Sequence, residues 1–188
     1  MEILYAIHFY SDWHCSSGLT SGTDADSLAI RDQDSLPYIP GKTIKGLLRE
    51  AASIFAEFSE DQEEWKQFLQ KCFGKQSDKE NNQSQEGICY FSNAELSKAV
   101  KVKLLENQKS PLRLIFRKIA STAIEDDGQA KEHSLRKMEV TVPLVLFGQI
   151  QDCPDEYKDK MRSCLQWVKR LGVNRNRGLG RCDIKEVI

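Results

Sequence analysis

The change from irregular chain to helix is marked by the segment Leu36-Pro37-Tyr38-Ile39-Pro40-Gly41-Lys42-Thr43-Ile44-Lys45-Gly46-Leu47-Leu48-Arg49. Two prolines flank an aromatic and a branched residue, and because proline restricts both itself and the residue before it, a stiff, extended approach is predicted. Apolar residues then recur on one stripe of a helical wheel. They are Ile44, Leu47, Leu48, Ala51, Ala52, Phe55 and Phe58. The segment therefore predicts a helix that follows directly on an extended stretch.

The chain before this segment contains one strand and one long loop. Residues 3–10 alternate between two largely apolar faces, which predicts a central strand covered on each side. Residues 12–40 show no helical or strand period and are rich in Ser, Gly and Asp. A connection of about 29 residues far exceeds the usual length of about 4–6, and loops of that length are usually functional or disordered.

Two further helices follow from the same kind of periodicity. One is predicted from about Glu60 to Phe73, with Trp65 and Phe68 on its apolar side. The other is predicted over residues 154–171, because proline suits a first helical turn and Gly172 suits a helix end.

The remaining segments are strands and one polar insert. Residues 88–91 predict a short strand, and Met138–Phe147 alternates most clearly, with Pro143 marking an edge or a bulge. Residues 182–188 predict the final strand. Residues 75–86 contain no apolar side chain, and we expect a mobile insert there. Strands at both ends with helices between them predict an α+β sheet domain whose helices cover one face.

The composition sets further bounds. The 188 residues carry 27 Lys plus Arg and 28 Asp plus Glu, a formal net charge of −1, and they suit a single domain spanning 1–188. Any nucleic-acid role must then rest on local basic patches. No apolar run is long enough to span a membrane, and no secretory signal is visible. The six cysteines show no C-x-x-C pair, which favours reduced thiols of a cytoplasmic protein and does not support a structural zinc site.

Basic residues gather at the start of the first helix. Gly41-Lys42-Thr43 imitates part of a phosphate-binding P-loop, but Leu36 stands where that motif needs glycine, so nucleotide hydrolysis is not expected. The free N–H groups of a helix start, with Lys42, Lys45 and Arg49 beside them, can seat a phosphate backbone. Alternatively, these residues form a solvated basic face.

A second basic segment is Gly172-Val173-Asn174-Arg175-Asn176-Arg177-Gly178-Leu179-Gly180-Arg181. It contains three glycines, three arginines and two asparagines, but no acid. Glycine permits close approach of a ligand to the backbone, and arginine forks onto phosphates or stacks on bases. The segment predicts a phosphate-binding loop.

Aspartates crowd the long early loop at positions 24, 26, 32 and 34. Near a phosphate-binding surface they must hold a metal ion, do chemistry or cap turns, and we expect turn caps for Asp32 and Asp34. With His8, His14 and His133 as its only histidines, the chain is a poor candidate for a paired-histidine ribonuclease.

Three stretches resemble the RAMP superfamily of CRISPR RNA-binding proteins. Residues 26–49, with Leu-Pro-Tyr-Ile-Pro-Gly and Lys-Gly-Leu-Leu-Arg, look like its signature, and Asn174–Arg181 looks like its C-terminal glycine-rich loop. Residues 119–147, through Ala130-Lys-Glu-His-Ser-Leu135, resemble its thumb hairpin segment. Together these stretches cover roughly half of the chain in the expected order.

The resemblance implies a ferredoxin-like (RRM-type) antiparallel sheet with a thumb hairpin within residues 119–137. It implies a subunit of a type III CRISPR interference complex, similar to the backbone subunit that lines the guide RNA and cleaves paired target RNA. Other effector subunits and further copies of this chain are then partners. The catalytic aspartate of that subunit falls on Asp26, with Asp24 as an alternative. The residues expected to hold guide RNA are Lys42, Lys45, Arg49, Arg175, Asn176, Arg177, Gly178, Gly180 and Arg181.

A loop aspartate, with a reference pKa of about 3.9, is too acidic to be an efficient general base at neutral pH. We therefore expect Asp26 to hold a divalent Mg²⁺ or Mn²⁺ ion that aligns the ribose 2′-hydroxyl. No organic cofactor is expected. One alternative is a RAMP scaffold or capping subunit that binds guide RNA without cutting. A less favoured one is a guide-processing ribonuclease that uses His14 or His133.

Overall fold

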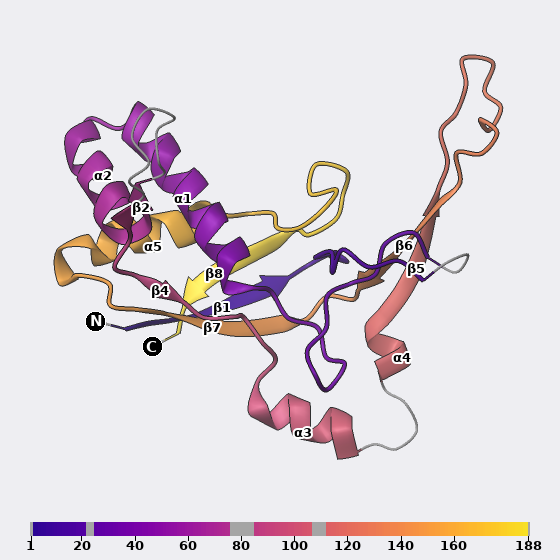
Figure 1. The fold of residues 1–188 in the computed structure, drawn as a ribbon, viewed down its shortest axis with the longest axis horizontal. Helices are drawn as coiled ribbons and strands as arrows, with labels where there is room; N and C mark the ends of the chain where they lie inside the picture. Colours follow the sequence, from indigo (N-terminus) through magenta and orange to yellow (C-terminus); the bar gives the residue numbers. More distant parts are fainter. Residues whose placement is uncertain (1, 22–24, 76–84, 107–111, 188) are drawn as a thin grey trace.

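A four-stranded antiparallel sheet forms the centre of the computed structural model, which describes residues 2–21, 25–75, 85–106 and 112–187 (Figure 1). In spatial order its strands are β4 (Tyr90–Phe91), β7 (Val145–Gln151), β1 (Ile3–Phe9) and β8 (Cys182–Glu186). The first strand is thus internal, and strands from the C-terminal part of the chain pair with both of its edges.

Only one face of this sheet is covered. In β1, Ile3, Tyr5 and Ile7 are fully buried, whereas Leu4 on the opposite face keeps 49% of its surface exposed. On the same opposite face of β7, Phe147 is 41% exposed. The prediction that residues 3–10 are covered on each side is therefore wrong, because apolar residues on both faces of a strand do not guarantee a covering layer on both.

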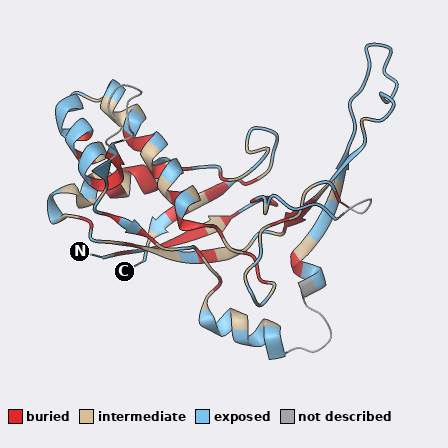
Figure 2. Cartoon of the chain, in the orientation of Figure 1, coloured by how far each residue is buried: buried red, intermediate tan, exposed pale blue. Residues whose placement is uncertain are grey.

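Helices cover the buried face, as the sequence pattern predicted (Figure 1). The amphipathic helices at 41–58 and 158–167 present their apolar stripes to the sheet, and one contiguous cluster of buried residues lies between the layers. Figure 2 marks the buried positions of these elements in red. The predicted helix at 154–171 is shorter in the structure because the backbone turns extended at Val168. The helical elements of this layer are α1 (Gly41–Phe58), α2 (Gln62–Phe68), the π-helical turn η1 (Leu69–Phe73), the 3-10 turn η2 (Asp155–Tyr157) and α5 (Lys158–Trp167).

A second, two-stranded sheet projects away from the central one (Figure 1). Strands β5 (Phe116–Ser121) and β6 (Arg136–Thr141) pair along their whole length, and the distal loop 122–135 that joins them is almost wholly exposed (Figure 2). The predicted strand at 138–147 is thus split near Pro143 into β6 and β7, which belong to different sheets. Proline cannot donate to a ladder, so the strand changes sheets where it sits. We call β5, the distal loop and β6 the projecting hairpin.

The remaining elements are short. Two helices, α3 (Lys98–Glu106) and α4 (Leu112–Ile115), precede the hairpin. Strands β2 (Gly74–Lys75) and β3 (Gln85–Glu86) pair at the two ends of the polar insert, whose residues 76–84 lie outside the described part of the chain. None of the described helices has the length and apolar character needed to cross a membrane.

Candidate functional site

Asp26 lies at the base of the projecting hairpin. Its N–H donates to the Lys137 carbonyl at 2.8 Å, and its own Oδ2 accepts the Lys137 N–H at 2.7 Å. Asp26 is exposed, so this double link to β6 holds its carboxylate at the surface. Asp24, the alternative catalytic residue, lies outside the described residues.

The segment that carries Asp26 is fastened to β6 at several further points, and we call residues 25–31 the aspartate loop. The Glu139 N–H donates to the Ser27 carbonyl at 3.0 Å. The Glu139 carboxylate in turn accepts the Ala29 N–H at 3.1 Å and the Arg31 guanidinium at 2.6 Å. Because Glu139 is largely buried, these charge-assisted bonds hold the loop firmly against the hairpin.

His14 is the buried junction of the site. Its Nδ1 lies 2.6 Å from the Glu139 carbonyl, and its Nε2 lies 2.9 Å from the Ser27 hydroxyl. A carbonyl can only accept, so Nδ1 donates and the Ser27 hydroxyl donates to Nε2. Burial lowers the pKa of His14, although its contacts with Glu139 oppose the shift. The imidazole is therefore a neutral structural group with both nitrogens engaged.

The glycine-rich loop (residues 172–181) packs on the same residue. The Val173 N–H donates to the His14 carbonyl at 2.8 Å, and the Gly180 N–H donates to the Asp12 carbonyl at 2.7 Å. The aspartate loop and the glycine-rich loop, about 140 residues apart in sequence, thus meet through His14. This contiguity is the main geometric finding about the site.

Two of the glycines in this loop serve close packing. A Cβ on Gly180 would lie 1.8 Å from the Leu171 carbonyl oxygen, and one on Gly172 would lie 2.4 Å from the His14 carbonyl oxygen. Gly178 also has a positive φ but faces open space. The glycine pattern therefore reflects intramolecular packing at two of three positions, and Gly178 is the one of the three that leaves room for a ligand.

The basic residues of the loop differ in their surroundings. Arg175 forms an ion pair with Glu50 of α1, its Nη2 lying 3.2 Å from Oε1. Asn176, Arg177 and Arg181 are exposed. Arg175 and Asn176 line a hollow between α1 and the end of α5. Arg177 and Arg181 are thus the arginines that the loop presents to solvent.

Lys42 sits beside this junction. Lys42 and the Thr43 hydroxyl lie close enough to Cys15 to oppose the increase that burial causes in the pKa of its thiol. Cys15 directly follows His14, so the start of α1 lies near the residue on which the glycine-rich loop packs. Lys45 is half-buried on the next turn of α1.

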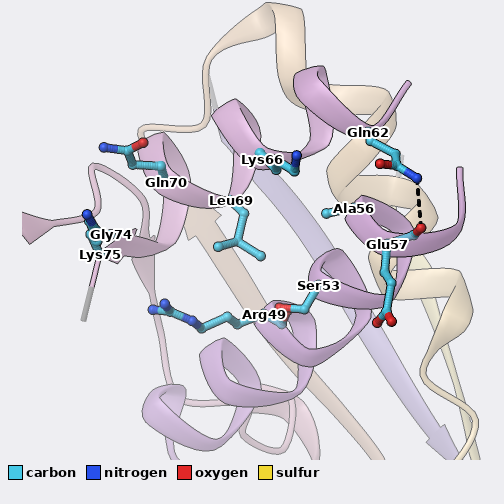
Figure 3. A pocket seen from close by; sticks show the side chains of 10 residues that line it. All are labelled: Arg49, Ser53, Ala56, Glu57, Gln62, Lys66, Leu69, Gln70, Gly74 and Lys75. Carbon is cyan, nitrogen blue, oxygen red and sulfur yellow. Dashed lines mark hydrogen bonds between the residues drawn. The ribbon is translucent and has the colours of Figure 1, made fainter. Parts of the chain in front are cut away.

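Arg49 points to another side of α1. It lines a groove of about 540 Å³ between α1 and the α2–η1 helices, and its side chain extends toward the end formed by Gly74 and Lys75 (Figure 3). Lys66 contributes a further cation to this groove, and Glu57 an acid. The Arg49 groove and the Arg175 hollow use different residues of α1, so these two arginines flank the helix.

Two other candidates, Asp32 and His133, lie in a turn and in an exposed loop. Asp32 caps a turn, because its Oδ1 accepts the N–H groups of Asp34 and Leu36, each at 2.9 Å. His133 lies in the exposed distal loop with a positive φ of 56°. The turn-cap prediction for Asp32 is confirmed.

Sequence reasoning missed Glu139, Arg31 and the role of His14. Glu139 is the one charged residue of the predicted strand at 138–147, and a buried acid needs a partner. That signal indicated a buried ion pair, but it could not name Arg31, which lies 108 positions away in the chain.

Comparison with known proteins places this geometry in a family. The family model of the RAMP superfamily matches residues 7–183, and the chain therefore belongs to the RAMP superfamily. No curated protein sequence gives a significant match.

Solved structures agree on the fold. The chain is similar to a chain in the cryo-EM structure of the type III-B Cmr-beta bound to cognate target RNA. That match has a TM-score of 0.73, 13% identity and coverage of 99% of this chain and 97% of the other. It is also similar to a chain of the Cmr-beta apo state, with a TM-score of 0.68, 15% identity and coverage of 100% and 97%. The antiparallel sheet with its helices thus has a fold similar to that of a chain in Cmr-beta.

Proposed function

We propose that this chain is a subunit of a type III CRISPR effector complex that binds guide RNA along its backbone and cleaves the paired target RNA. Family membership supports the assignment, as does the similarity to a Cmr-beta chain whose complex is bound to cognate target RNA. The observation that carries the proposal is the position of Asp26, exposed at the base of the projecting hairpin and joined through Ser27 and His14 to the glycine-rich loop.

In this proposal the central sheet is a ferredoxin-like, RRM-type arrangement and the projecting hairpin is the thumb. The spatial order β4-β7-β1-β8 supports it, as does the chain order of strand, helix, two strands, helix and strand. The hairpin enters between β4 and β7 and reaches away from the sheet (Figure 1). Its exposed Ile124 and Leu135 supply apolar side chains that can wedge between base pairs.

The guide RNA backbone would lie along the start of α1 and the glycine-rich loop. The Gly41 N–H already donates to Asn93 Oδ1 at 3.0 Å and the Thr43 N–H to the Pro40 carbonyl at 2.9 Å, so the helix start contributes the positive end of its dipole together with Lys42 and Lys45. The loop adds Arg175, Asn176, Arg177, Gly178 and Arg181. Gly180 is buried and its N–H donates to the Asp12 carbonyl, so it supports the loop and does not contact the RNA. Arg49, in its separate groove, would contact a more distant part of the strand. Because such contacts reach phosphates, they position RNA without reading its sequence. The other partners are effector subunits and further copies of this chain.

Asp26 is the proposed catalytic residue and the ligand of a divalent ion. Its Oδ2 is occupied by the Lys137 N–H, which leaves Oδ1 as a hard oxygen donor at the surface. One carboxylate fits Mg²⁺ or Mn²⁺, which keep several waters and take further ligands from substrate phosphates. Such an ion supplies charge stabilisation at the scissile phosphate and activation of the 2′-hydroxyl. The task of the chain itself is to hold the carboxylate still, through β6.

A scaffold or capping subunit is the second candidate, and one observation favours it. Among the described residues, Asp26 belongs to no group of three side chains that could bind a metal ion. A subunit that only holds guide RNA needs no such group. The guide-processing alternative is less favoured because His14 is fully buried with both ring nitrogens engaged, so it cannot reach RNA.

The decisive experiment is target RNA cleavage by the assembled complex that carries Asp26→Asn. The amide keeps an oxygen for the Lys137 N–H but loses the charge. We expect cleavage opposite this subunit to fall by about 100-fold or more while guide RNA binding is unchanged. Asp34→Asn is the matched control, since Asp34 is an exposed aspartate nearby in the chain.

The outcomes separate the candidates. Cleavage that needs Mg²⁺ or Mn²⁺ and is lost only in Asp26→Asn supports the catalytic role. Unchanged cleavage in Asp26→Asn, with Asp24→Ala also active, leaves the scaffold subunit as the function. Loss of guide RNA binding in Asp26→Asn would point to a structural defect and contradict a purely catalytic role.

A further inference from the structure

Three of the six cysteines meet in the core, although they come from three separate parts of the chain. Cys72 is the penultimate residue of η1, Cys89 directly precedes β4, and Cys153 lies two residues after β7. Their sulfur atoms all lie within 4.8 Å of one another, and all three residues are buried. We call them the cysteine trio. The other cysteines, Cys15, Cys164 and Cys182, are buried but join no such group among the described residues.

The backbone around the trio is arranged so that these sulfurs approach. The Ile88 N–H donates to the Lys71 carbonyl at 3.0 Å, and the Cys89 N–H donates to the Cys72 carbonyl at 3.3 Å. Gly87 must be glycine for this approach, since a Cβ there would lie 2.3 Å from the Cys72 carbonyl oxygen. These contacts align Cys89 with Cys72.

Cys153 completes the group from the other side. Asp152, just before it, has a positive φ of 59°, and its carbonyl accepts the Cys89 thiol at 3.9 Å. The Cys72 and Cys89 thiols each form a side-chain hydrogen bond with the Cys153 thiol. The three thiols thus interact with one another rather than with apolar neighbours alone.

From this geometry we propose that Cys72, Cys89 and Cys153 bind a structural Zn²⁺ ion. The inference is independent of RNA binding and of Asp26. Zinc takes cysteine sulfur at about 2.3 Å in tetrahedral geometry, which puts ligand sulfurs about 3.8 Å apart. Sulfurs within 4.8 Å of one another reach that spacing with small side-chain rotations. The fourth position falls to water.

The site has a structural purpose. A zinc ion bound there would join three segments: η1, the residues just before β4, and the residues just after β7. They lie at the edge of the central sheet that β4 forms. The polar insert at 75–86 begins and ends close to the same point, because β2 (Gly74–Lys75) pairs with β3 (Gln85–Glu86) between Cys72 and Cys89. An ion at this position would fix the two ends of the insert, β2 and β3, to the core.

The alternative is an ordinary packed core. Free cysteine behaves as a small hydrophobic residue, and Cys164, fully buried in α5, is of that kind. This contrast supplies the control, since Cys153→Ala and Cys164→Ala remove the same atoms from positions that are both 0% exposed. A difference in metal content between the two variants cannot then come from a lost buried thiol alone.

The test is the metal content of the full chain, purified without an affinity tag in a reductant that does not bind zinc. We expect about one zinc per chain in the wild type and in Cys164→Ala, and less than about a tenth of that in Cys153→Ala. Removing zinc with a chelator should lower the Tm of the first two by about 5–10 °C, and adding zinc back should restore it. The chelator should not shift the Tm of Cys153→Ala.

A cobalt titration tests the site in the wild-type protein and therefore does not depend on whether a cysteine variant folds. Stripped wild-type protein titrated with Co²⁺ should show thiolate-to-cobalt charge-transfer bands and visible bands of tetrahedral intensity, which saturate at about one equivalent. The proposal is overturned if the wild type carries no zinc, takes up no cobalt and keeps three reduced thiols. A disulfide within the trio, or one equivalent of another metal, also overturns it.

Discussion

The aspartate loop (residues 25–31) and the glycine-rich loop (residues 172–181) meet at His14 but are held in different ways. The first is fastened by side chains in addition to two backbone bonds, since the side chains of Asp26, Ser27 and Glu139 all take part in the bonds that join it to β6 and to His14. The second is fastened by its backbone and by the absence of side chains at Gly172 and Gly180.

Each loop must be attached to the rest of the fold and must expose a functional side chain to solvent. The two loops assign these tasks to residues in different ways. In the aspartate loop one side chain does both, because Asp26 is bonded to β6 by Oδ2 and faces solvent. In the glycine-rich loop the glycines hold, while Arg177 and Arg181 are left at the surface. The first loop therefore tolerates only isosteric changes at its functional residue, whereas the second should tolerate loss of its arginines without unfolding.

The largest expected effect separates two glycines of the same loop. Gly180→Ala should destabilise the protein by about 3 kcal/mol or more, because its Cβ would collide with the Leu171 carbonyl and its φ is +68°. Gly178→Ala faces open space at a φ of +91°, and the left-handed conformation alone should cost about 1–2 kcal/mol. Urea unfolding of both variants measures the difference in the free energy of unfolding. Equal losses of stability would contradict the distinction between Gly180, which packs closely, and Gly178, which faces open space.

The next effect tests the junction shared by both loops. The folded-state pKa of His14 is lowered, so below its unfolded value of 6.5 the unfolded chain binds more protons than the folded one. The free energy of unfolding should therefore fall as the pH drops from about 7 to about 5, by at most about 1.4 kcal/mol per pH unit for this group.

The measurement is urea unfolding across this pH range in the wild type, His14→Gln and His133→Gln. His133 is exposed in the distal loop, so its variant should keep the wild-type slope. His14→Gln should show a shallower slope, since glutamine does not titrate. The same slope in all three proteins would contradict the buried, neutral state of His14.

The smallest effect concerns the arginines presented by the glycine-rich loop. Arg177→Ala should reduce the slope of log K for RNA against log salt by about 0.7, the value for one phosphate contact to single-stranded nucleic acid. Arg175→Ala should reduce it less, because the Arg175 guanidinium is shared with Glu50 at 3.2 Å. Arg113→Ala, at an exposed position of α4, is the control and should leave the slope unchanged. If the slope fell more in Arg175→Ala than in Arg177→Ala, Arg175 and not Arg177 would be the main phosphate contact of the loop.

Much of the fold could be predicted from the periodicity of apolar residues and from the prolines and glycines at the ends of elements. The stripe after Gly41, the stripe around Trp65 and Phe68, and the strands at both ends correspond to α1, α2 with η1, β1 and β8. What could not be predicted was the division of residues 138–147 between two sheets. Alternation tells which side chains share a face, but it does not tell which partner strand that face meets.

The candidate site was predicted in its parts but not in its arrangement. The basic start of α1 and the glycine-rich loop were recognised from composition, and the structure brings Lys42 and the loop near His14. It also separates Arg49 from Arg175, which the one-dimensional spacing of basic residues could not show. The glycine pattern predicts close approach of a ligand, yet Gly172 and Gly180 pack against carbonyl oxygens of the chain itself.

By itself the amino-acid order determined the positions of α1, α2 with η1, β1 and β8, and which residue types were available for chemistry. Those properties depend on neighbours within a few positions, where propensity and periodicity act. Tertiary structure alone decided that His14 is a buried junction, that Glu139 meets Arg31, and that Cys72, Cys89 and Cys153 share one point of the core. Such meetings depend on strand register and on helix packing over long stretches of chain, and no local pattern encodes them.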